Sequence, residues 1–168
     1  SRQRFEREAR AAAAIRSEHV CRVMDVGVLD SGMLYLVMEH LSGSDVQVLL
    51  KEGPLSLEVA VKYLLQACEA LAQAHQLGIV HRDLKPANLF VSTGADGEPC
   101  VKLLDFGISK LTQDFETDIE SLTKTAAMMG SPLYMAPEQM VSAKAVDTRA
   151  DVWAIGCIFY EMLTGRPP

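Results

Sequence analysis

Three short motifs constrain the fold of this chain more than any other feature. Residues 81–88 read His-Arg-Asp-Leu-Lys-Pro-Ala-Asn, residues 105–107 read Asp-Phe-Gly, and residues 136–138 read Ala-Pro-Glu. The four fixed residues of the first motif alone would arise by chance in about one chain in a thousand of this length. The fold must therefore place two separated carboxylates and an amide on neighbouring loops.

Length and composition exclude several classes of protein. The 168 residues suffice for one domain with a core, and 49% apolar with 23% charged residues is ordinary for a globular domain. A net charge of -6 argues against a nucleic-acid partner, which calls for a basic stripe. The four cysteines lie far apart, so we expect thiols in a reducing compartment. No apolar run reaches the about 18 residues of a membrane span, so we expect no membrane contact within this segment.

The N-terminal part predicts one helix and two strands. Residues 2–16 are rich in alanine and carry an apolar stripe at helical spacing. Residues 20–29 and 33–38 predict strands joined by a turn at residues 30–32. Residues 42–44, Ser-Gly-Ser, interrupt the pattern and predict a short connector.

A long helix is predicted over residues 57–76. Ser56 can cap its start and Gly78 can end it. We expect its buried face to consist of Leu57, Val61, Leu64, Leu65, Cys68, Leu71 and Ala72. A second helix, residues 149–164, is apolar nearly all round, which predicts burial in the middle of the domain.

The remaining segments predict short strands and a long loop. Residues 89–92 and 101–104 predict strands around a turn, and residues 108–135 show little periodicity. A loop of that length is more often functional than a passive connection. Together the helices and strands indicate an α+β fold.

The three motifs resemble those of the protein-kinase family. Lys85 within Asp-Leu-Lys-Pro-Ala-Asn and the segment 130–139 are similar to bacterial serine/threonine kinases. The resemblance implies a protein-kinase-like α+β fold that is mostly the helical C-lobe, with one helix and two strands of the N-lobe. The implied boundaries are residues 1–38 for the partial N-lobe, 39–45 for the hinge and 46–168 for a C-lobe that stops after its central helix.

The resemblance assigns the chemistry to four residues. Asp83 would orient and deprotonate the substrate hydroxyl, and Lys85 would neutralise charge at the γ-phosphate of ATP. Asn88 and Asp105 would bind Mg²⁺ through oxygen atoms, which hard cations prefer. A surface loop with scattered charges is the alternative for any one of these residues alone.

The resemblance also implies an adenine site. The backbone of Glu39 and Leu41 would bond the base, Met38 would guard the back pocket, and Phe90 would lie under the ring. Asp45 is placed to meet the ribose hydroxyls, or equally to cap the next short helix.

Glu8 interrupts the apolar stripe of the first predicted helix. A carboxylate there needs a cation, and by resemblance it would pair with a strand lysine that holds the phosphates and would lie before Ser1. The alternative is a pair with Arg4 one turn away, which we expect in an isolated fragment. Since no glycine-rich phosphate loop precedes the motifs, we expect an internal fragment that is weak or inactive alone.

His81 and Phe106 are interpreted as structural residues. A histidine beside an apolar strand is usually a core residue with a satisfied hydrogen bond, and the resemblance implies that His81 stacks on Phe106. Gly107 would give the backbone its freedom at the Asp-Phe-Gly motif.

Asp151 has two open interpretations. Residues 148–151 fit a capping box, whereas the resemblance has Asp151 accept hydrogen bonds from the backbone of the 81–88 loop. Glu138 would pair, in the family, with an arginine of a later helix, so we expect its carboxylate to be unpaired.

Arg82 and two threonines are candidates for regulation. An arginine just before the catalytic aspartate can pair with a phosphate on the activation loop, although Arg82 could simply be solvated. Thr123 and Thr125 lie where related bacterial kinases carry paired phosphothreonines, although ordinary loop threonines remain the alternative.

The resemblance thus predicts an ATP- and Mg²⁺-dependent protein serine/threonine kinase, cytoplasmic in this domain, with a Ser/Thr-containing protein as substrate. A membrane anchor could lie elsewhere in a full-length protein. The main alternative is a pseudokinase or inactive fragment that serves as a binding module. Small-molecule kinases of the aminoglycoside type share a similar loop but usually lack the other two motifs.

Overall fold

The computed structural model describes residues 13–31, 33–94, 96–106, 132–141 and 146–168. The elements in chain order are β1 (Val23–Val28), β2 (Leu34–Met38), β3 (Gly43–Asp45), α2 (Val46–Leu49), η1 (Leu50–Glu52), α3 (Leu57–Gln76), η2 (Pro86–Asn88), β4 (Leu89–Thr93), β5 (Pro99–Leu103), η4 (Pro132–Tyr134), α5 (Pro137–Val141) and α6 (Arg149–Thr164).

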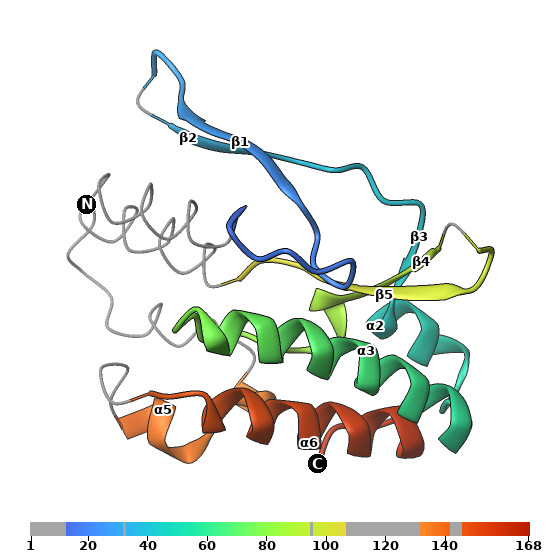
Figure 1. The fold of residues 1–168 in the computed structure, drawn as a ribbon. Helices are drawn as coiled ribbons and strands as arrows, with labels where there is room; N and C mark the ends of the chain where they lie inside the picture. Colours follow the sequence, from blue (N-terminus) through green and yellow to red (C-terminus); the bar gives the residue numbers. More distant parts are fainter. Residues whose placement is uncertain (1–12, 32, 95, 107–131, 142–145) are drawn as a thin grey trace.

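The described elements form layers with a projecting hairpin (Figure 1). Helices α3 and α6 lie side by side, and the sheet of β3, β4 and β5 packs on the other side of α3. The β1–β2 hairpin extends away from these layers. This mixture of helices and strands agrees with the α+β fold expected from the sequence.

The expected hairpin is confirmed, with a later start. Strands β1 and β2 pair antiparallel, from Val23 opposite Met38 to Val28 opposite Leu34. The chain just before β1 pairs with β5 instead: Cys21 N–H donates to Leu103 O at 2.9 Å, and Leu103 N–H donates to His19 O at 2.9 Å. Residues 20–22, predicted as strand, therefore anchor the hairpin to the second sheet.

The predicted connector at residues 42–44 is wrong in part, because Gly43–Asp45 form strand β3. This strand pairs antiparallel with β4, Gly43 opposite Ser92 and Asp45 opposite Phe90. Gly43 has φ 149°, and a Cβ atom there would lie 2.0 Å from Val91 O. The glycine that looked like a turn residue is thus needed for close approach of two strands.

Helix α3 has the predicted bounds and cap but a different buried face. Ser56 Oγ accepts a hydrogen bond from Val59 N–H at 3.3 Å, and Gly78 adopts φ 73° just after the helix. Leu57, Val61, Leu65, Cys68 and Ala72 are exposed, so their predicted burial is wrong. The buried residues are Ala60, Tyr63, Leu64, Ala67, Ala70, Leu71 and Ala74. The helix carries two apolar stripes, and the one richer in small alanines packs against β5 and α6.

Helix α6 is buried on one face only. Ala150, Asp151, Ala154, Ile158 and Met162 are buried, whereas Trp153 on the opposite face is 49% exposed. The prediction of burial all round is therefore wrong for the described chain, where α3 and η4 cover a single side of α6. Thr148 precedes the helix without a side-chain capping bond, so the capping box is also wrong.

Residues 2–12 of the first predicted helix lie outside the described chain. Ile15 and Arg16, which we expected at its end, lie in irregular chain, so that boundary is wrong. Ile15 is nevertheless buried in the main core, as its place on the apolar stripe suggested. Among the described helices, none combines the length and apolarity needed to cross a membrane.

Candidate active site

The loop of residues 81–88 follows α3 after a short stretch at residues 77–80, and its last three residues form η2. Its last residues close into a turn, with Pro86 at the start of η2 and Asn88 N–H donating to Lys85 O at 2.9 Å. Proline suits the first position of a helical turn because its missing N–H would have no partner there. The local sequence thus sets the end of the loop directly before β4.

Three of the predicted catalytic residues meet in this loop. Lys85 Nζ lies 3.1 Å from Asp83 Oδ2. Asn88 Nδ2 donates to the backbone oxygen of Asp83 at 2.7 Å. The Asp83 side chain is 12% exposed, so its carboxylate is mostly enclosed but still reachable. A carboxylate, an ammonium and an amide therefore share one small site.

Two hydrogen bonds tie the Asp105 segment to the same loop. Leu104 N–H donates to Asn88 O at 2.9 Å, and His81 Nε2 donates to Leu104 O at 2.8 Å. Asp105 follows directly, in the left-handed backbone region at φ 56°. The two loops that carry Asp83 and Asp105 are therefore bonded to each other, and not separated across the molecule.

His81 lies in the interior between these loops. Its ring contacts the ring of Phe106 with centroids 4.7 Å apart, so the expected contact is present, although the planes are tilted by 46° and not stacked in parallel. Burial lowers the pKa of His81, against the opposing influence of Asp151 and the Leu104 carbonyl. The neutral ring accepts from Asp83 N–H at Nδ1 over 3.4 Å, so its proton lies on Nε2.

The side chain of Asp151 holds the backbone of the 81–88 loop. This buried carboxylate on α6 accepts from His81 N–H and Arg82 N–H, each at 2.9 Å, and from His75 Nε2 at 2.8 Å. The expected bonds to the loop backbone are confirmed. A buried charge needs such partners to be tolerated. Sequence reasoning missed His75, although its place in the last turn of α3, one turn after buried Leu71, was a signal.

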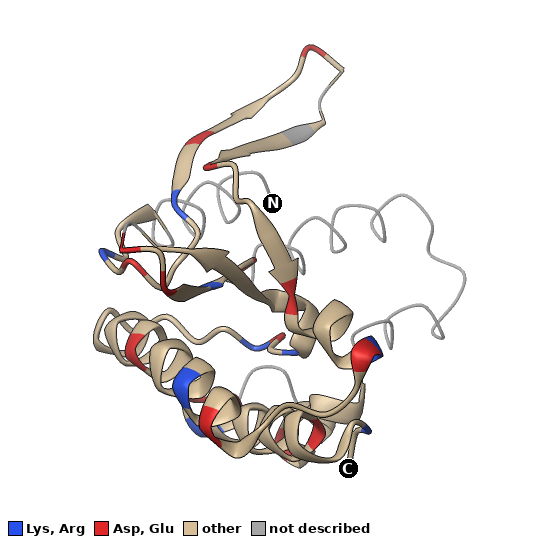
Figure 2. Cartoon of the chain, turned by 90° about the vertical axis from the view of Figure 1, so that its right-hand side faces the viewer, with Lys and Arg blue, Asp and Glu red and all other residues tan. Residues whose placement is uncertain are grey.

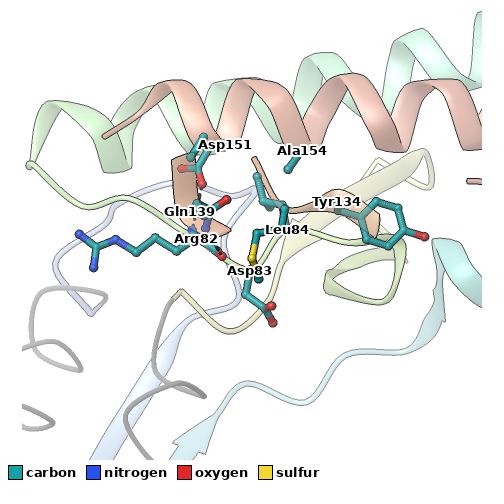
Figure 3. A pocket seen from close by; sticks show the side chains of 9 residues that line it. Arg82, Asp83, Leu84, Tyr134, Gln139, Asp151 and Ala154 are labelled. Atoms are coloured by element: carbon teal, nitrogen blue, oxygen red, sulfur yellow. Dashed lines mark hydrogen bonds between the residues drawn. The ribbon is translucent and has the colours of Figure 1, made fainter. Parts of the chain in front are cut away.

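A pocket adjoins the loop (Figure 3). The side chains of Arg82 and Asp83 point in different directions from the loop, and Asp151 on α6 lies above them in this view. The residues that line the pocket are Arg82, Asp83, Leu84, Tyr134, Met135, Gln139, Ala150, Asp151 and Ala154. Burial and a hydrogen bond to Glu161 raise the pKa of Tyr134, which keeps its hydroxyl protonated.

The segment after β2 holds the predicted adenine-binding residues. Met38 ends β2, and Leu41 is half-buried. Glu39 N–H donates to Arg22 O at 3.0 Å, and Glu39 Oε1 accepts from Arg22 N–H at 2.9 Å and from Lys102 Nζ at 3.0 Å. Although burial raises the pKa of Glu39, these hydrogen bonds lower it below its usual value.

Asp45 and Phe90 are cross-strand neighbours in the second sheet. Phe90 on β4 lies opposite Asp45 on one side and Lys102 on the other. Asp45 Oδ1 accepts from Val48 N–H at 2.9 Å, so the capping role of Asp45 is confirmed. The charges of this sheet are Asp45 on β3 and Lys102 on β5, since β4 has none; Figure 2 colours acidic residues red and basic residues blue. The arrangement brings Phe90 and the Glu39–Lys102 pair to one region.

Several predicted site residues lie outside the described chain, namely Glu8, Gly107, Thr123 and Thr125. Glu138 is exposed, and its carboxylate makes no salt bridge with any residue that the structure describes. Within the described ranges, no cluster of three or more His, Cys, Asp and Glu side chains could hold a metal ion. Asn88 and Asp105 carry oxygen donors of the kind that Mg²⁺ takes, and this ion usually keeps several waters and few protein ligands.

The comparisons with known proteins agree with this geometry. The chain is 40% identical over 166 residues to the serine/threonine-protein kinase pkn3 of Myxococcus xanthus, covering 98% of this chain and 30% of that protein. It is 41% identical over 169 residues to the serine/threonine-protein kinase PknB of Mycobacterium tuberculosis, covering 98% of this chain and 26% of that protein. The chain thus spans between a quarter and a third of the length of these curated relatives.

Solved structures give the same result at the level of the fold. A crystal structure of the PknI kinase domain of Mycobacterium tuberculosis matches with a TM-score of 0.77 and 28% identity, over 99% of this chain and 57% of that chain. The family model described as the protein kinase domain matches residues 1–168. The chain therefore belongs to the protein kinase domain family.

Proposed function

We propose that this chain is part of an ATP- and Mg²⁺-dependent kinase that phosphorylates serine or threonine hydroxyls of proteins. One observation carries the proposal: Asn88 O and His81 Nε2 both bond Leu104, so the Asp83 loop and the Asp105 segment form one site. The names of the relatives, all serine/threonine-protein kinases, support the type of substrate.

In this proposal Asp83 acts on the attacking hydroxyl. Its carboxylate accepts the hydroxyl proton while the substrate oxygen bonds the γ-phosphorus and the bond from that phosphorus to ADP breaks. Lys85, 3.1 Å from Asp83 Oδ2, lies where it can offset charge on the transferred group. Because the chemistry needs little covalent help, positioning these groups is the main task of the protein.

The Mg²⁺ ligands would be Asn88 and Asp105. The bond from Asn88 Nδ2 to Asp83 O uses the amide nitrogen, so the amide oxygen remains to accept a cation. When bound, the ion neutralises charge on the phosphates. Asp105 comes from the other loop, so a shared ion would join the two loops further.

The adenine site would lie at the segment of residues 39–45, as the hinge between an N-lobe of residues 1–38 and a C-lobe of residues 46–168. The Glu39 and Leu41 backbones would bond the base, with Met38 behind it and Phe90 beneath it. Support comes from the fixed position of Glu39, which is bonded through both its N–H and its carboxylate. Asp45 could reach the ribose only with the oxygen that does not cap α2.

The proposal also includes the compartment of the domain and its regulation by phosphorylation. We place the domain in the cytoplasm because all four cysteines are free thiols, which suits a reducing compartment. Phosphorylation of Thr123 and Thr125 would supply a phosphate for Arg82. Glu8 would form an ion pair with the lysine of the same protein that binds the phosphates of ATP.

Measurement of phosphate transfer by the full-length protein that carries this chain tests the proposal. Asp83→Asn should lower kcat by roughly 10²–10⁴-fold, the usual contribution of a general base. Transfer that does not depend on Asp83 would contradict the proposed mechanism. Binding of ATP without transfer would instead favour the alternative, a pseudokinase that serves as a binding module. The chain of 168 residues assayed by itself should be weak or inactive.

A further inference from the structure

The residue before Asp83 has a strained backbone. Arg82 adopts φ 67°, a strained region that residues other than glycine seldom visit. Such a conformation persists only where the surroundings hold it. Arg82 N–H is held by Asp151 Oδ1 at 2.9 Å.

The peptide group that joins Arg82 to Asp83 is held at both of its polar atoms. Asp83 N–H donates to His81 Nδ1 at 3.4 Å. Arg82 O accepts from Gln139 Nε2 at 3.0 Å. The next carbonyl, Asp83 O, accepts from Asn88 Nδ2 at 2.7 Å. The backbone on both sides of the Asp83 side chain is therefore fixed by side chains.

Gln139 differs from the other residues that hold this backbone. It comes from α5, 57 residues further along the chain than Arg82, and is half-buried. Its Oε1 accepts from Ala136 N–H at 3.1 Å, and its own N–H donates to Ala136 O at 2.9 Å. Because Ala136 is fully buried, the Gln139 side chain is anchored on its own segment while it reaches the loop. Figure 3 shows Gln139 beside Arg82.

We propose that Gln139 is a positioning residue for Asp83, which fixes the Arg82–Asp83 peptide so that the carboxylate faces the attacking hydroxyl. The inference rests on the proposed kinase function. Rotation of this peptide group would change the φ of Asp83, and a change in φ that is not compensated turns the Cα–Cβ bond and misplaces the carboxylate. A misplacement of about 1 Å can cost roughly 10²-fold in rate, so loss of one of several holders should cost less.

Two variants of the full-length protein isolate the bond. Gln139→Glu keeps the size of the side chain and the acceptor for Ala136 N–H, but places an oxygen opposite the Arg82 carbonyl. Gln139→Met keeps the approximate shape and removes both bonds. Met140→Gln, on the same short helix but exposed, is the matched control. Both Gln139 variants should lower kcat by about 10-fold, with KM for ATP unchanged within about twofold.

Hydrogen exchange supplies a readout that does not need activity. The peptide that spans residues 80–88 should exchange faster in Gln139→Glu, while the peptide of α3 exchanges as in the wild type. If the wild type transfers phosphate and both Gln139 variants match Met140→Gln in kcat, the inference is overturned. Unchanged exchange of residues 80–88 overturns it as well. A wild type without phosphate transfer would contradict the proposed function instead, and hydrogen exchange would still decide the role of Gln139.

Discussion

The loop of residues 81–88, which carries the candidate catalytic residues, and the β1–β2 hairpin are held in opposite ways. Around residues 81–88, backbone groups bond side chains that arrive from α6, α5 and η2. The hairpin makes its backbone bonds chiefly within itself. Its Val26 and Leu36 pack on the main core, but large apolar side chains such as Met24, Met33 and Val37 are exposed. A two-stranded hairpin alone is marginally stable in water, so the precision of the site must come from the layers around the loop.

Lys102 lies at the joint between these two regions. Its Nζ donates to Glu18 O at 2.9 Å, before the hairpin, and to Glu39 Oε1 at 3.0 Å, after it. Lys102 is on β5, three residues before Asp105. The Lys102 side chain thus connects both ends of the hairpin to β5, the strand that precedes the candidate metal ligand Asp105.

Removing the Asp151 carboxylate should destabilise the loop of residues 81–88 more than any other single change. Asp151→Ala would leave His75 and two loop N–H groups without their acceptor in the interior. Loss of one partner in a buried ionic network usually lowers the free energy of unfolding by about 3–5 kcal/mol. Chemical denaturation of the chain measures the change. Asp147→Ala, which removes an exposed pair with Arg149, is the control and should have little effect.

A similar stability for Asp151→Ala and Asp147→Ala would mean that the loop does not depend on this support. The hairpin gives a second check in the same experiment. Hydrogen exchange should rise at residues 81–84 in Asp151→Ala and stay unchanged in β1 and β2, because these strands make no bond to Asp151.

Lowering the pH should weaken the loop region through His81. Burial lowers the pKa of His81, so the unfolded chain takes up this proton at a higher pH than the folded chain. The stability from neutral His81 is complete above the ordinary histidine pKa of about 6.5 and is lost as pH falls towards the folded-state pKa. Denaturation curves over this range should show a falling free energy of unfolding. His81→Phe should show a shallower dependence, and equal slopes would assign the effect to other groups.

A double-mutant cycle at Lys102 and Glu39 tests whether their ion pair fixes the segment that follows the hairpin. The Lys102 side chain is 17% exposed and that of Glu39 is 26% exposed, so the coupling free energy between them should be modest. Lys102→Met in the full-length protein should raise KM for ATP by about fivefold, or ~1 kcal/mol, and adding Glu39→Gln should cost little more. Lys62→Met, which breaks an exposed pair with Glu98, should leave KM unchanged. Fully additive effects would show that the pair does not hold the hinge.

Local patterns predicted much of the fold, and motif spacing predicted the centre of the site. The bounds of α3 and α6 follow from periodicity, and the meeting of Asp83, Lys85 and Asn88 follows from their place in one loop. The missed residues act over long separations. His75, Lys102 and Gln139 bond partners 76, 63 and 57 residues away, which no local pattern reveals.

The wrong predictions have a related cause. Gly43–Asp45 became a strand because β4 pairs with it, and the buried stripe of α3 was decided by what packs on it. Larger apolar residues such as Leu57 and Leu65 gave no sign that alanines would face the core. Local propensity is a weak prior wherever tertiary contacts decide between two similar alternatives.

The smallest change in the free energy of unfolding is expected for a substitution on the hairpin itself. Met33 is 65% exposed beside the hairpin turn, so Met33→Thr should change the free energy of unfolding by no more than about 0.5 kcal/mol. Leu103→Ala, at a fully buried position of β5, should cost about 2–5 kcal/mol and is the contrasting variant. Chemical denaturation of both variants compares the stability contributed by the hairpin tip with that contributed by β5, the strand that anchors the hairpin. If Met33→Thr destabilised the chain as much as Leu103→Ala, the hairpin would have to be part of the main cooperative unit, and the proposed ATP-binding segment would then be as firmly held as the loop of residues 81–88.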